Sequence, residues 1–130
     1  MTTATEGTVL VVDDDAMVRQ VTALLLRKAG YEVVQATNGR EAVERVTEQA
    51  DALDVVLLDV MMPVMTGHEA FPRMRAAAPR LPIVFFSGFD QSEVAEHLVD
   101  PTAHTAFLPK PYTDTDLYDA IAQAVASRRA

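Results

Sequence analysis

Four short apolar runs in this chain each end in a residue that could take part in phosphoryl chemistry. These residues are Asp13 and Asp14 after the first run, Asp59 after the second, Ser87 after the third and Lys110 after the fourth. Short apolar runs of this kind are typical of buried parallel strands, whose carboxyl ends meet at one edge of a sheet. We therefore expect the three carboxylates, the hydroxyl and the ammonium group to converge at that edge.

Three converging carboxylates repel one another unless a cation lies among them, and Mg²⁺ is the ion that prefers such oxygen ligands. A metal ion and Lys110 would neutralise the oxygens of a phosphoryl group, and Ser87 would hydrogen-bond another oxygen. Asp59 would then be a nucleophile that forms an acyl phosphate. Taken singly, each feature has a simpler interpretation: Asp15 as a helix cap, Ser87 as part of a turn, and Lys110 as a solvated loop residue.

The elements that must position these residues alternate along the chain. Strands are expected over residues 9–12, 31–36, 54–58, 83–86 and 106–108, each followed by a helical apolar pattern. These helices are marked by Val18, Val21 and Leu25, by Ala42 to Val46, by Ala70 to Ala77, by Val94 to Leu98 and by Leu117 to Val125. Pro72 is expected in the first turn of the third helix. Five alternating β/α units predict an α/β fold with a parallel sheet and helices on both faces.

Composition limits the possible classes of function. The chain has 130 residues, of which 49% are apolar, and this is enough for one globular domain. Its net charge of −8, with no basic stripe, argues against nucleic-acid binding. The absence of cysteine, of a signal peptide and of a membrane-length apolar run leads us to expect a cytoplasmic protein that makes no membrane contact.

Four segments resemble the motifs of response-regulator receiver domains of two-component signalling. VLVVDDD resembles the acidic motif of that family, DVVLLDVMMPVMTG its phosphoacceptor motif, FFSG its hydroxyl motif and FLPKP its lysine motif. The resemblance implies a single-domain, doubly wound, flavodoxin-like fold with strand order 2-1-3-4-5. It covers residues 8–127, and we expect a disordered segment at residues 1–7 and a tail at residues 128–130.

The resemblance also implies roles for the acidic residues and their neighbours. Asp59 would be the phosphoacceptor, and Asp14 and Asp59 would bind Mg²⁺ directly, together with the backbone carbonyl of Met61. Asp13 would assist through a water molecule. Met61 and Phe89 would flank the path by which water reaches the phosphoryl group.

The remaining roles concern the response to phosphorylation. Ser87 and Lys110 would sense the phosphoryl group, and Phe107 would be the switch aromatic. The Lys110–Pro111 bond is similar to one that the family usually holds in the cis form. The changing surface would be formed by residues 94–98, the fifth strand and the last helix, where a downstream protein would bind.

The resulting hypothesis is a phosphoacceptor module that catalyses only its own phosphorylation and dephosphorylation. Its phosphoryl donor would be a histidine kinase or a histidine phosphotransfer protein. The alternative is a small Mg²⁺-dependent phosphatase of the haloacid dehalogenase type, with Asp13 and Asp15 as its acidic pair. That alternative needs further acids at a late strand end, whereas Asp114 and Asp116 are predicted to lie in a helix, and it leaves Asp59 unexplained.

Overall fold

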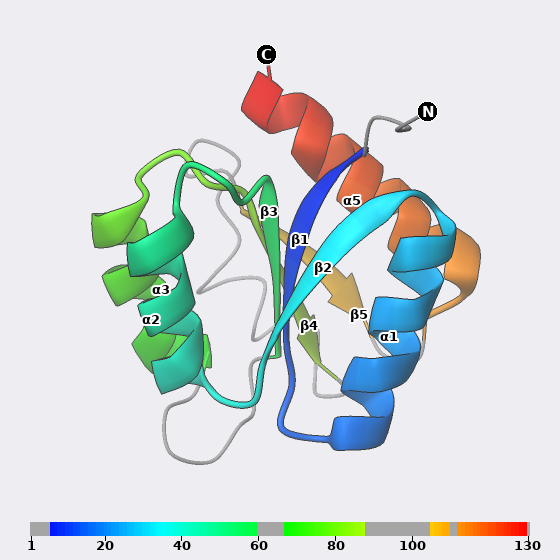
Figure 1. Ribbon diagram of the computed structural model, residues 1–130, viewed down its shortest axis with the longest axis horizontal. Helices are drawn as coiled ribbons and strands as arrows, with labels where there is room; N and C mark the ends of the chain where they lie inside the picture. Colours follow the sequence, from blue (N-terminus) through cyan, green and yellow to red (C-terminus); the bar gives the residue numbers. More distant parts are fainter. Residues whose placement is uncertain (1–5, 60–66, 88–104, 110–111, 130) are drawn as a thin grey trace.

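A five-stranded parallel sheet forms the centre of the molecule (Figure 1). The structure is a computed structural model that describes residues 6–59, 67–87, 105–109 and 112–129. Its strands are β1 (Gly7–Val12), β2 (Tyr31–Ala36), β3 (Val55–Asp59), β4 (Ile83–Ser87) and β5 (Thr105–Pro109). Their order is β2-β1-β3-β4-β5, which confirms the predicted fold class and strand order.

Helices cover both faces of this sheet (Figure 1). Helices α1 (Ala16–Lys28) and α5 (Asp114–Arg129) lie on one face, and α2 (Gly39–Gln49) and α3 (Gly67–Ala77) lie on the other. The helix predicted around residues 94–98 lies outside the described residues. Within the described ranges, none of the helices combines the length and the apolar character that a bilayer crossing requires.

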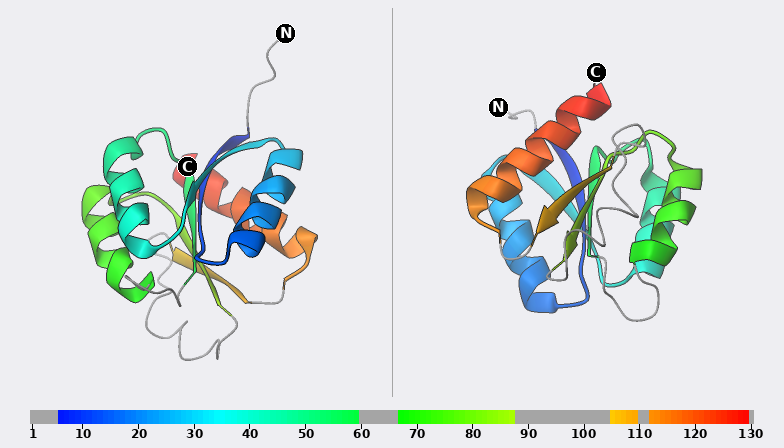
Figure 2. Two further views of the ribbon diagram at one scale, coloured as in Figure 1. Left: turned by 60° about the horizontal axis from the view of Figure 1, so that its bottom comes forward. Right: turned by 180° about the vertical axis from the view of Figure 1, so that it is seen from behind.

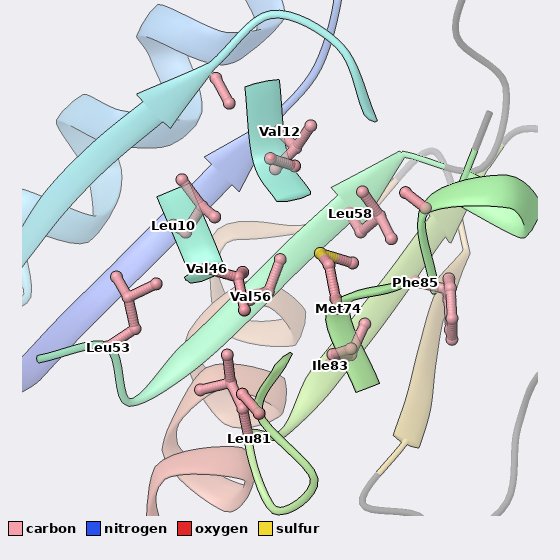
Figure 3. Packing of buried hydrophobic residues seen from close by; sticks show 14 residues of the cluster. Leu10, Val12, Val46, Leu53, Val56, Leu58, Met74, Leu81, Ile83 and Phe85 are labelled. Atoms are coloured by element: carbon pink, nitrogen blue, oxygen red, sulfur yellow. The ribbon is translucent and has the colours of Figure 1, made fainter. Parts of the chain in front are cut away.

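The sheet separates two apolar cores, one beneath each pair of helices. Figure 3 shows the core under α2 and α3, where alternate residues of β1 and β3 meet Met74 of α3 and Phe85 of β4. The second core lies under α1 and α5 and includes Leu26, Leu117 and Ile121. All five residues of β3 are buried, because this central strand has a core on each face. Burial on both faces fixes where β3 ends and therefore where Asp59 lies.

Side-chain caps fix the beginnings of three helices. The Asp15 carboxylate accepts hydrogen bonds from the amides of Met17 and Val18, and so caps α1 as the sequence suggested. The Asn38 side chain caps α2 in the same way. Thr113 and Asp116 bond reciprocally at the start of α5 and form a capping box. Because these caps sit at the ends of the β/α loops, they also fix the loops around the sheet edge.

Two sequence-based expectations about the helices need correction. Val21 is about half exposed, and the buried face of α1 consists of Thr22, Ala23 and Leu26, so these residues rather than Val21 face the sheet. Pro72 lies inside α3 and not in its first turn, because that helix already begins at Gly67.

The ends of the folded region also differ slightly from the predicted bounds of residues 8–127. Gly7, expected in a disordered segment, is the first residue of β1, and α5 continues into the expected tail as far as Arg129. Arg128 donates a hydrogen bond to the carbonyl of Ala50 at 3.3 Å, and its guanidinium lies 3.9 Å from the Asp54 carboxylate. These contacts tie the last turn of α5 to the segment between α2 and β3.

Candidate phosphoryl-transfer site

Strand register brings two buried carboxylates together at the carboxyl edge of the sheet. Val12, the last residue of β1, pairs with Leu58 of β3, and an aspartate follows each of them, Asp13 just after β1 and Asp59 at the end of β3. Asp13 is 1% exposed and Asp59 is 6% exposed. In Figure 2 this edge is turned toward the viewer in the left panel. The predicted meeting of the first and third strands at this edge is therefore observed.

Asp14 joins these two residues and completes an acidic cluster. One carboxylate oxygen from each of Asp13, Asp14 and Asp59 lies within 4.8 Å of the others. A point within about 2.8 Å of all three oxygens therefore exists, close to the ~2.0–2.6 Å oxygen distances of Mg²⁺ and Ca²⁺. Asp14 is exposed, which leaves the cluster open to an incoming ion and its waters. The donor set and its spacing fit a small divalent cation.

The backbone around Asp13 is fixed by several hydrogen bonds. Its amide donates to the Ala36 carbonyl of β2 at 3.2 Å, and its carboxylate accepts from the Asp15 amide at 2.9 Å. Its carbonyl accepts from Nη1 of Arg19 at 2.8 Å, and Nε of Arg19 donates to the Gln35 side chain at 3.2 Å. The sequence analysis missed Arg19 and Gln35. A basic residue in the second turn of a helix that follows an acidic loop was the available signal.

Other predicted site residues are only partly described. Ser87 is the last residue of β4 and pairs in register with Pro109, so its backbone reaches the same edge as Asp59. The expectations for Met61, Phe89, Lys110 and the Lys110–Pro111 peptide bond concern residues outside the described ranges. Their roles stay predictions.

The predicted switch aromatic, Phe107, lies in β5 and pairs in register with Phe85. It is partly buried and packs against the core beneath α2 and α3. The ring of Phe85 meets that of Phe71 of α3 edge to face, with 5.3 Å between centroids. Phe107 thus lies at the border between this core and the surface.

Comparison with known proteins extends these observations. The family model of the response regulator receiver domain matches residues 9–122. The chain belongs to this family. It is 35% identical over 114 residues to the chemotaxis protein CheY of Thermotoga maritima, covering 87% of this chain and 92% of that protein. The crystal structure of a receiver domain protein from Clostridium thermocellum superposes with a TM-score of 0.87 and 28% identity, covering 95% of this chain and 97% of that one.

A second structural relative bears on the metal. The receiver domain of the sensor histidine kinase PA1611 from Pseudomonas aeruginosa has a TM-score of 0.82 and 25% identity, covering 95% of this chain and 99% of that chain. In that crystal structure a magnesium ion is coordinated in the active site cleft. Several other relatives are longer proteins, including sensor kinases, and the chain spans only 9 to 58% of the length of such relatives.

Three of the acids that the phosphatase alternative would use lie at the beginnings of helices. Asp15 caps α1, and Asp116 belongs to the capping box of α5. Asp114 lies in the first turn of the same helix, where a negative charge favours the helix dipole. These positions give Asp15, Asp114 and Asp116 structural roles, whereas Asp59 belongs to the acidic cluster.

Proposed function

We propose that this receiver domain accepts a phosphoryl group on Asp59 and uses the acyl phosphate as a signal. The observation that carries the proposal is the cluster of Asp13, Asp14 and Asp59 at the carboxyl edge of the sheet. The donor would be a phosphohistidine of a histidine kinase or of a histidine phosphotransfer protein. The chain would catalyse only its own phosphorylation and dephosphorylation. A cytoplasmic location stays a prediction.

In the proposed reaction an oxygen of the Asp59 carboxylate attacks the phosphorus atom. The phosphorus–nitrogen bond of phosphohistidine breaks, and its electron pair and a proton remain on the imidazole of the donor. Mg²⁺, held by Asp14, Asp59 and the Met61 carbonyl with help from Asp13, would supply positive charge for the phosphoryl oxygens. Burial of Asp59 at the end of a rigid strand fixes the direction of attack, which lowers the entropic cost of the reaction.

The signal would arise from residues that contact the new phosphoryl oxygens. A phosphoryl group shifts a conformational equilibrium only through interactions that differ between the two states. Ser87 and Lys110 would make those interactions, and Phe107 would change its packing at the border of the core. The surface of residues 94–98, β5 and α5 would then change its affinity for a downstream protein.

The exposed face of α1 is our candidate docking surface for the phosphohistidine donor. Met17, Val21 and Leu24 are 74%, 51% and 53% exposed and lie at helical spacing. The helix begins immediately after Asp13 and Asp14, so a protein that delivers a phosphoryl group to Asp59 would also reach this face. Apolar side chains beside the site favour a partner helix with a complementary apolar surface.

Two carboxamide variants distinguish the proposed function from the phosphatase alternative. Asp59→Asn removes the proposed nucleophile, and Asp15→Asn removes the acid that the phosphatase needs while keeping an oxygen to cap α1. With Mg²⁺ and radiolabelled acetyl phosphate, we expect labelling to be lost in Asp59→Asn and retained in Asp15→Asn. The reverse pattern, with turnover of a phosphomonoester, would favour the phosphatase.

A further inference from the structure

Arg19 joins three parts of the fold at the edge of the acidic cluster. It lies in the second turn of α1, donates from Nη1 to the carbonyl of Asp13 at 2.8 Å and donates from Nε to the side chain of Gln35 at 3.2 Å. Gln35 belongs to β2, the neighbour of β1. The guanidinium thus connects the helix, the β1–α1 loop and the adjoining strand.

The bond to the Asp13 carbonyl affects both acidic residues of the loop. A peptide unit is planar, so fixing the carbonyl of Asp13 also fixes the amide and the Cα atom of Asp14. The amide of Asp13 is already held by the carbonyl of Ala36 at 3.2 Å. With both peptide groups of Asp13 held, the direction in which the Asp13 side chain leaves the backbone is set, and so is the position from which the Asp14 side chain starts.

The charge of Arg19 acts against metal binding. A guanidinium stays positively charged in proteins, and a cation beside the cluster repels a divalent ion. Loss of that charge alone would therefore tighten metal binding. Loss of the hydrogen bonds, in contrast, would free the β1–α1 loop and weaken metal binding. Because the charge and the hydrogen bonds of Arg19 change the metal affinity in opposite directions, the affinity of a variant shows which of them dominates.

We propose that Arg19, held in place by Gln35, is a positioning residue that orients Asp13 and Asp14 for the divalent cation. The planar fork of arginine can bond two acceptors at once with fixed geometry, which a lysine ammonium cannot reproduce. This inference rests on the proposed function, because that function supplies the reason for a cation at the cluster. It adds two residues, neither of which touches the ion.

The test is the Mg²⁺ affinity of the full chain, measured by isothermal titration calorimetry. Partners that orient metal ligands typically contribute tenfold or more to affinity, so Arg19→Gln should weaken Mg²⁺ binding by about tenfold. Gln35→Met changes no charge and should also weaken Mg²⁺ binding, but by a smaller factor than Arg19→Gln. The double variant should bind Mg²⁺ no more weakly than Arg19→Gln alone, because both changes break the same hydrogen-bonded pair of Arg19 and Gln35.

Two further variants control for charge and for stability. Arg27→Gln removes the same charge from the exposed last turn of α1 and should leave the Mg²⁺ affinity unchanged, because solvent screens distant charges. Arg19→Lys keeps the charge and should bind Mg²⁺ more weakly than wild type. Thermal unfolding in EDTA records any general loss of stability in each variant.

Several outcomes would overturn the inference. Tighter Mg²⁺ binding by Arg19→Gln would show that charge alone matters, and unchanged affinity with a lowered melting temperature would show a purely structural contact. If wild type is phosphorylated on Asp59 and these variants bind Mg²⁺ normally, only the role of Arg19 fails. A wild-type chain that binds no Mg²⁺ would overturn both this inference and the proposed function.

Discussion

Replacing Asp13 by asparagine should change metal affinity and stability in opposite directions. The change removes one negative charge but keeps a side-chain oxygen that can still accept from the Asp15 amide. Asp13 is 1% exposed and an oxygen of its carboxylate lies within 4.8 Å of an oxygen of Asp59, which is 6% exposed. The variant therefore tests charge while preserving the local hydrogen bond.

The metal effect can be bounded from the spacing of the cluster. An ion among the three oxygens lies no farther than 4.8 Å from the Asp13 oxygen. At that distance a divalent cation and one negative charge attract each other by about 1.7 kcal/mol, even at the dielectric constant of bulk water. That energy corresponds to about 20-fold in the dissociation constant. Since Asp13 and Asp59 are buried, we expect Asp13→Asn to lose at least this much Mg²⁺ affinity.

Without metal the same change should stabilise the fold. Two like charges 4.8 Å apart repel by about 1 kcal/mol in bulk water and by about 3.5 kcal/mol at an effective dielectric of 20. Relief of this repulsion should raise the melting temperature in EDTA by roughly 3 to 10 °C. In saturating Mg²⁺ the advantage should shrink or reverse, because the ion stabilises wild type more strongly.

Asp51→Asn is the matched control, because Asp51 is exposed and follows α2 at the opposite edge of the sheet. Calorimetric Mg²⁺ titration and thermal unfolding of both variants, with EDTA and with Mg²⁺, provide the measurements. Our reasoning would be refuted if Asp13→Asn bound Mg²⁺ within threefold of wild type and showed no stabilisation in EDTA.

Three further predictions concern stability, coupling and signal lifetime. Arg75→Met should cost about 2 kcal/mol in chemical denaturation, because Nη1 of Arg75 donates to three carbonyls between α3 and β4. Thr22→Val and Tyr112→Phe should destabilise the fold non-additively in a double-mutant cycle, because their hydroxyls lie 3.2 Å apart. Met61→Asn/Phe89→Glu should lose its phosphoryl group faster than wild type, since polar side chains can orient the attacking water; equal decay rates would show that these side chains do not gate water.

The acidic cluster could be predicted from sequence because it depends on strand ends. Asp13 and Asp59 each end an apolar run, and runs that are buried on both faces have few possible positions in a parallel sheet. The carboxyl edge then follows from topology alone. The same reasoning placed Ser87 at the end of β4.

Features that depend on side-chain reach could not be predicted in this way. Arg19 finds Gln35 on a neighbouring strand, and periodicity does not encode the direction of a long side chain across two elements. Val21 is exposed because α1 approaches the sheet through the small side chains of Thr22 and Ala23. Pro72 was misplaced because the start of α3 at Gly67 was not recognised.

The central claim is that Asp59 accepts the phosphoryl group with the help of a divalent cation. The most direct measurement is mass spectrometry of the chain after incubation with Mg²⁺ and acetyl phosphate, with the acyl phosphate trapped by borohydride reduction before peptide mapping. We predict one phosphoryl group per chain, located on Asp59, and none when EDTA replaces Mg²⁺ or when Asp59 is changed to Asn. A phosphoryl group on any other residue, or equal uptake by Asp59→Asn, would contradict the account.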